Sequence, residues 1–181
     1  MRFELAAFAL IGFAGFASMP SQAAACEADY VLAPDNSALS VLFTDLTVEA
    51  GGATTAECTI DVPLELPEGM SLGVYRVDYR GFASLARKDV ATLTVDYELG
   101  PKGNSRHFKR SVRGATEDDF AFRENIGAGL MKRVGCGVDA HLRGSVTLSL
   151  DGKGDESLAT LDSSDGASRH GLVYRFNLKP C

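Results

Sequence analysis

The stretch CGVDAHLRGSVTLSL, residues 136–150, alternates apolar and polar side chains along most of its length. A repeat of two residues indicates a β-strand with one buried face and one solvated face. Such one-sided strands are typical of antiparallel sheets that cover a core on one side only. The apolar positions are Cys136, Val138, Ala140, Leu142, Val146, Leu148 and Leu150. This stretch therefore predicts a long antiparallel strand.

The same alternation recurs on both sides of this stretch. Further apolar–polar repeats occupy residues 39–43, 58–66, 75–79, 91–99 and 172–178. Turn-forming residues separate the repeats, at positions 34–36, 51–52, 67–69, 100–101, 151–152 and 165–166. Six or more one-sided strands imply two sheets packed face to face. We therefore predict an all-β fold, an antiparallel two-sheet β-sandwich, as a single domain over residues 26–181.

Residues 102–135 interrupt this pattern, because they show no clean alternation. Phe122, Ile126 and Leu130 follow one another at a spacing of four residues, as on one face of a helix. Gly127 and Gly129 weaken a helix at this place. The segment is expected to be an irregular or short-helical excursion from the sandwich, either a functional segment or a mobile hairpin extension.

The first 25 residues are typical of an export signal. A basic residue, Arg2, precedes an apolar run from Leu5 to Ala17, and small residues occupy positions 23–25. The run is shorter than the roughly 20 residues that span a bilayer. We expect residues 1–25 to be a secretory signal peptide and Cys26 to begin a secreted or periplasmic chain with no transmembrane segment. Lipoprotein anchoring through Cys26 is the alternative.

An even number of cysteines in an exported chain implies disulfides. The four are Cys26, Cys58, Cys136 and Cys181, which allow three pairings that the sequence leaves open. Cys58 and Cys136 each lie on the apolar face at the start of a predicted strand, which is compatible with a bridge between them. The working expectation is therefore Cys58–Cys136 with Cys26–Cys181.

Charge and motifs narrow the function classes. The 181 residues have a formal net charge of −6, and this acidic balance argues against general nucleic-acid binding, which needs a basic surface. The sequence contains no nucleophile elbow, zinc-protease motif, dinucleotide-binding motif or P-loop. It also contains no pair of cysteines with two residues between them. We expect no cofactor and no metal, and a non-catalytic extracellular binding or surface-interaction module rather than an enzyme.

The candidate contact region is a basic cluster within residues 102–135. It consists of Lys102, Arg106, His107, Lys109, Arg110 and Arg113. In an acidic protein such a cluster creates a strong dipole and suits an anionic partner, such as a membrane surface, a polysaccharide or a protein. The contrary interpretation is a solvated hairpin tip.

Residues 75–80 combine charged and aromatic side chains in one predicted strand. Arg76 and Arg80 share a face with Asp78, so an ion pair is expected there, whereas Tyr75 and Tyr79 are expected to point into the core. Most aromatic side chains follow the inward pattern and tryptophan is absent, which counts against a typical sugar-binding platform.

Two alternative functions stay open. A small secreted hydrolase would use His141, two residues after Asp139 on the polar face of one strand, with a serine such as Ser145 nearby. A structural envelope or matrix component needs no site at all. Acidic turns at residues 151–156 and 162–166 are oxygen-rich, as calcium prefers, but lack the EF-hand spacing.

Several segments together resemble a family of small secreted proteins from fungi and bacteria, the domain-of-unknown-function family 4360. The matching pieces are residues 34–38, 58–62, 67–69, 77–83, 136–137 and the last strand that ends in Cys181. The most specific piece is Asp78-Tyr79-Arg80-Gly81-Phe82-Ala83. The chain departs from the family at Ala25-Cys26-Glu27, where Gly-Cys-Pro is common, and in its last strand, which lacks the usual tryptophan. The resemblance implies a secreted, disulfide-bonded β-protein and supplies no activity.

Overall fold

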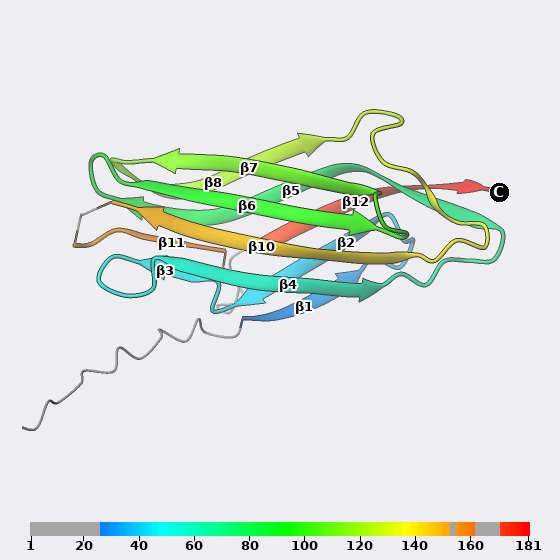
Figure 1. Cartoon of the computed structure of the whole chain (residues 1–181), viewed down its shortest axis with the longest axis horizontal. Coiled ribbons are helices and arrows are strands. Elements are labelled where there is room, and N and C mark those ends of the chain that lie inside the picture. Colours follow the sequence, from blue (N-terminus) through cyan, green and yellow to red (C-terminus); the bar gives the residue numbers. More distant parts are fainter. Residues whose placement is uncertain (1–25, 153–154, 162–170) are drawn as a thin grey trace, which may run out of the picture.

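A computed structural model describes residues 26–152, 155–161 and 171–181 (Figure 1). The expected signal peptide, residues 1–25, and the acidic turn at 162–166 lie outside the described residues. The described residues form twelve β-strands and no helix. The all-β prediction is therefore confirmed.

The strands form two antiparallel sheets, which Figure 1 shows one in front of the other. The four-stranded sheet has the order β4 (Thr55–Pro63), β10 (His141–Asp151), β6 (Val90–Leu99), β7 (Ser105–Arg113). The eight-stranded sheet has the order β1 (Glu27–Leu32), β2 (Ala38–Thr44), β12 (Gly171–Pro180), β5 (Met70–Leu85), β11 (Leu158–Thr160), β3 (Thr47–Glu49). On its other edge, β5 pairs with β8 (Thr116–Asn125) and β9 (Val134–Gly135).

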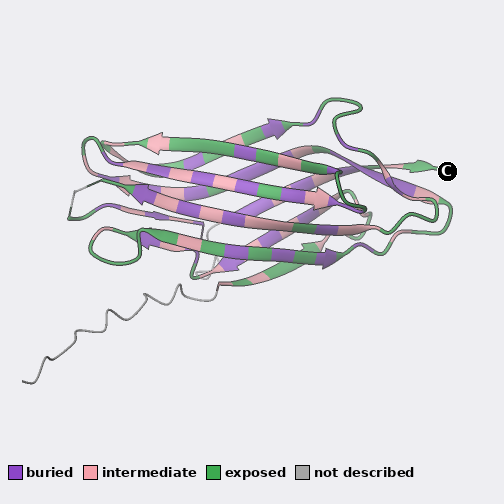
Figure 2. Cartoon of the chain, in the orientation of Figure 1, coloured by how far each residue is buried: buried purple, intermediate pink, exposed green. Residues whose placement is uncertain are grey.

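The core lies between the sheets, where their inward-facing side chains meet. In β10 the predicted alternation is observed from Leu142 onward, with Leu142, Val146, Leu148 and Leu150 buried. The strand begins only at His141, and Cys136 and Val138, which were expected on its buried face, are exposed. Figure 2 shows the same alternation along β2, β4 and β6. The predicted two-sheet sandwich is confirmed.

Most of the supposed excursion at 102–135 is regular strand. β7 extends the four-stranded sheet and β8 extends the eight-stranded sheet, so the turn between them crosses from one layer to the other. Apart from the turns at residues 102–104 and 114–115, only residues 126–133 of this segment lie outside a strand, and the expected helix around Ile126 does not form. The alternation was invisible because β7 is an edge strand on which Phe108 alone is buried.

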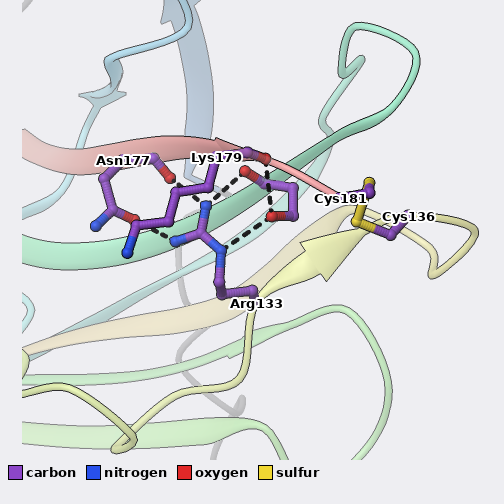
Figure 3. Close-up of a disulfide and its surroundings, with 6 residues drawn as sticks. Arg133, Cys136, Asn177, Lys179 and Cys181 are labelled. Atoms are coloured by element: carbon purple, nitrogen blue, oxygen red, sulfur yellow. Dashed lines mark hydrogen bonds between the residues drawn. A yellow bond between two sulfur atoms is a disulfide. The ribbon is translucent and has the colours of Figure 1, made fainter.

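The disulfides are Cys26–Cys58 and Cys136–Cys181, so the expected pairing was wrong. Cys58 lies inside β4, but Cys136 is exposed and lies five residues before β10. Because β4 and β10 are antiparallel, their starts also lie at opposite ends of the sheet. Cys58 is paired with Val146, ten residues beyond Cys136. The Cys26 sulfur is bonded to Cys58, which leaves none for a lipid thioether. The Cys136–Cys181 bridge ties the end of β12 to the segment after β9 (Figure 3).

A β-bulge in β5 changes the face on which one tyrosine lies. Arg76 pairs with Arg175 of β12, but the next pair is Val74 with Phe176, so Tyr75 is an extra residue. Val74 and Tyr79 are buried, whereas Tyr75 is 44% exposed. The prediction that Tyr75 points into the core is therefore wrong, and the same prediction for Tyr79 is confirmed.

Candidate functional site

The outer face of the eight-stranded sheet carries an arginine cluster around one buried carboxylate. Asp78, in the middle of β5, is only 7% exposed. Its Oδ2 atom lies 2.8 Å from Nε of Arg175 and 3.1 Å from Nε of Arg76, and its Oδ1 atom lies 3.1 Å from Nε of Arg123. Three strands supply these groups, since Arg123 comes from β8 and Arg175 from β12. The expected pair between Arg76 and Asp78 is thus one part of a larger network.

The arginines keep Asp78 ionised. Burial by itself would raise the pKa of the Asp78 carboxyl, but hydrogen bonds from Arg175 and Arg123 and the charge of Arg76 outweigh burial and hold this pKa below the ordinary 3.8. Three guanidinium groups therefore share one negative charge at neutral pH. The cluster is positively charged in a chain whose formal net charge is −6.

The arginines leave most of their donors unused. Each contacts Asp78 through Nε, and none of their Nη groups makes a hydrogen bond within the part of the chain that the structure describes. Arg80, two residues further along the same face of β5, is exposed and forms no salt bridge with a described residue. Guanidinium groups bind planar oxyanions with paired N–H donors. The arrangement therefore offers several preoriented donors to an anion above the sheet.

Directly beneath the cluster, the opposite face of β5 and β8 holds a buried polar network. Glu124 accepts hydrogen bonds at Oε2 from the hydroxyls of Tyr79, at 2.8 Å, and Tyr97, at 3.0 Å. Arg106 of β7 donates to Oε1 of the same carboxylate from Nη2 at 3.0 Å and from Nε at 3.2 Å. Burial, assisted by the negative charge of neighbouring Glu124, raises the pKa of both tyrosine hydroxyls above the ordinary 10.0. The network joins the two sheets and keeps β8 in place.

Five of the six residues of the segment Asp78–Ala83 have a clear structural role. Asp78 and Arg80 belong to the outer face, and Tyr79 and Ala83 to the core. A Cβ atom on Gly81 would lie 2.5 Å from the Phe120 ring and 2.5 Å from a backbone oxygen of β11, so only glycine fits. The segment thus joins the arginine cluster to the core in alternate positions.

Residues 24–181 match the family described as Domain of unknown function (DUF4360). The chain belongs to this family. One relative is an "Uncharacterized secreted protein" of Arthroderma benhamiae, 22% identical over 143 residues. That match covers 75% of this chain and 58% of the relative, so the chain spans little more than half the relative's length.

Among solved structures, the DUF4360 chain is similar to that of TmCBM61 in complex with β-1,4-galactotriose, at 14% identity and a TM-score of 0.34. The match covers 86% of this chain and 87% of the other. At this TM-score the likeness carries no argument about function.

The basic cluster predicted for this DUF4360 chain does not form one patch. His107, Lys109 and Arg113 lie on the outer face of β7, and His107 pairs with Asp96 at 2.7 Å. Arg106 and Arg110 point to the other face, where Arg106 binds Glu124 and Arg110 lies over the Phe108 ring. Lys102 lies in the preceding turn. The six residues are divided in this way because neighbouring residues of a strand point to opposite faces.

The hydrolytic site sketched around His141 is not assembled either. His141 contacts Asp61 of β4 and Arg143 of its own strand. Ser145 lies four residues further along β10, about 13 Å at the rise of an antiparallel strand. That separation excludes direct proton transfer between Ser145 and His141.

The described ranges also bear on metal binding and membrane spanning. They contain no cluster of three or more histidine, cysteine, aspartate or glutamate residues arranged to hold a metal. Nor do they contain a helix that is long and apolar enough to cross a membrane.

Sequence reasoning singled out Asp78, Arg76 and Arg80 but missed Arg123 and Arg175. Arg123 lies 45 residues from Asp78 and Arg175 lies 97 residues away. The one available signal was the polar alternation of the last strand, which places Arg175 on an outer face. The residues around Asp78 in the sequence do not reveal which strands lie beside it in the sheet.

Proposed function

We propose that this chain is an exported, non-catalytic binding module that holds an anionic extracellular ligand on the arginine cluster. The observation that carries the proposal is the buried Asp78, which holds three guanidinium groups by Nε and leaves their Nη donors without a hydrogen bond to any described residue. Two disulfides suit an oxidising compartment, and a relative is described as secreted. We further propose that residues 1–25 are removed and that the exported chain begins at Cys26.

The chemistry of the cluster favours binding over catalysis. The guanidinium group of arginine stays protonated at neutral pH. Asp78 is engaged by three cations, and its low pKa makes it a weak general base. A positive site within an acidic protein also concentrates the local field, which speeds capture of an anion at low ionic strength.

The test is a binding titration of the chain 26–181, with its disulfides intact, against polygalacturonate, polyphosphate and neutral dextran. Arg80→Gln removes one charge from the cluster without breaking a salt bridge to any described residue. We expect binding of the anionic polymers only, a several-fold loss in Arg80→Gln, and a steep decline between about 50 mM and about 200 mM NaCl.

The matched control is Lys109→Gln, which removes one exposed charge from the opposite sheet. We expect this variant to bind as the parent chain does. Equal losses in both variants would mean that net charge, rather than the cluster, governs binding. Absence of binding to every anionic polymer would refute the proposed function and leave the structural-component hypothesis.

A further inference from the structure

A pocket lies next to the arginine cluster, toward the start of β5 and the end of β12. Its volume is about 300 Å³, at the small end of ligand sites. Its walls include Tyr75, Ile126, Met131, Arg133, Asn177 and Lys179, and residues 127–129 also line it. Ile126 and Met131 are mostly buried, so the pocket has an apolar base and a polar rim.

The bulge in β5 gives this pocket its aromatic wall. Without the extra residue, the strand's alternation would turn Tyr75 into the core. Instead Tyr75 lies at the surface, 44% exposed, next to Arg76 of the cluster. Bulges frequently reorient a side chain at a functional site.

The polar rim is held rigidly (Figure 3). Arg133 donates to Oδ1 and to the backbone oxygen of Asn177, at 2.6 and 2.9 Å, and to the side-chain and backbone oxygens of Ser71, at 3.0 and 2.6 Å. A Cβ atom on Gly73 would lie 2.9 Å from Nη1 of Arg133, so glycine allows this arginine to lie across the strand. Because Oδ1 of Asn177 accepts from Arg133, its amide nitrogen is left to donate elsewhere.

The pocket and the cluster form one track along β5 and β12. Six basic side chains follow the two strands and their neighbours, with Asp78 as the carboxylate among them: Lys179, Arg133, Arg76, Arg175, Arg123 and Arg80. The pairs Lys179–Ser71 and Gly171–Arg80 mark its ends, eight residues apart on β12, or about 26 Å. Further along β8, the acidic residues Glu117 and Asp119 bound it.

From this track we infer that the ligand is a linear acidic polysaccharide whose sugar rings carry carboxylates, with one ring seated in the pocket against Tyr75 and the neighbouring carboxylates on the arginines. The inference rests on the proposed function and names its ligand class. The apolar face of a sugar ring packs on an aromatic side chain, and guanidinium groups pair with carboxylates.

Polyphosphates and neutral glycans each match only one part of this track, the arginines or the pocket. A polyphosphate has no ring for the pocket, and a neutral glycan leaves the guanidinium donors without an acceptor. A single-stranded nucleic acid has both rings and charges, so the test includes oligothymidylate as the competing ligand.

The test compares Tyr75→Ala and Tyr75→Phe in titrations with oligogalacturonate, polyphosphate, neutral maltooligosaccharide and oligothymidylate of similar length. We expect Tyr75→Ala to weaken oligogalacturonate binding about three- to tenfold and Tyr75→Phe to retain it, because the ring rather than the hydroxyl makes the contact. Polyphosphate binding should be unchanged in both variants. Tyr30→Ala is the matched control, since Tyr30 is 50% exposed on β1, at the edge of the same sheet.

The outcomes separate this inference from the proposed function. If Arg80→Gln weakens binding of every anion while Tyr75→Ala changes none, the module binds anions and the sugar inference is wrong. Tighter binding of oligothymidylate than of oligogalacturonate would also overturn the inference. If the parent chain binds no anion, the proposed function itself fails.

Discussion

Asp78 organises the outer face of the eight-stranded sheet because three arginines share its carboxylate. Its neighbour Tyr79 performs the complementary task inside, where it binds Glu124. Consecutive residues of one strand thus connect a surface cluster with a core network. Sequence reasoning identified Asp78 and its pairing with Arg76, but the energetic weight differs from that of an exposed pair, because Asp78 is buried.

Replacement of Asp78 by asparagine tests this role. The change leaves three guanidinium groups without their shared counter-charge, and we expect a loss of about 1–3 kcal/mol in the free energy of unfolding at pH 7, reduced by the partial exposure of the arginines. Urea unfolding monitored by circular dichroism measures it. Asp96→Asn, at an exposed aspartate paired with His107, is the control and should cost far less.

The stability difference between the parent chain and Asp78→Asn should also depend on pH. The pKa of Asp78 is lower in the folded chain than its ordinary 3.8, so the unfolded chain takes up the proton first as pH falls. The stabilisation is complete above the ordinary pKa and is lost as pH falls through the lower folded value. The difference in unfolding free energy between the parent and Asp78→Asn should therefore shrink below about pH 4. A difference that stays constant down to pH 2 would contradict this assignment.

At the scale of elements, β5 decides the architecture of the proposed site. Its sixteen residues pair with β12 and β11 on one edge and with β8 and β9 on the other. The bulge at Tyr75 places a ring beside the arginines, and residues 126–133 close the pocket from the neighbouring edge. The Cys136–Cys181 disulfide joins the two walls, since it links the end of β12 to the residues that follow β9.

Removal of this disulfide should loosen the pocket wall. The double variant Cys136→Ser, Cys181→Ser should lose about 4 kcal/mol in unfolding free energy, the chain-entropy value for a loop of this length. Backbone amide exchange at residues 177–179 should accelerate under conditions where the fold persists. The double variant Cys26→Ser, Cys58→Ser removes a bridge that closes a loop of similar size, and it should lose similar stability without faster exchange at 177–179. Equal acceleration in both would mean that β12 is held by the sheet alone.

At the scale of the whole molecule, the two disulfides lie toward the two chain ends of the described domain. One bridge secures Cys26, just before β1, and the other secures Cys181, just after β12. The first and the last described strands are thus each tied to an interior segment, which protects strands that would otherwise fray.

Mass spectrometry of the exported protein tests this arrangement and the proposed processing together. We expect an N-terminus at Cys26, no acyl mass, and non-reducing peptides that join Cys26 to Cys58 and Cys136 to Cys181. A peptide joining Cys58 to Cys136 would contradict the observed pairing. A diacylglyceryl adduct on Cys26 would contradict the Cys26–Cys58 bridge and place the protein at a membrane surface.

The sequence by itself determined the all-β class and the strands of the core, because alternation and turn chemistry are local properties, whereas residues 78–83 stood out only through the family resemblance. It failed at β7, where an edge strand buries too little to reveal its period. Only the tertiary structure decided the disulfide pairing, the exposure of Tyr75 and the arginines that surround Asp78. These depend on strand register, which is set by the packing of segments as far as 97 residues apart.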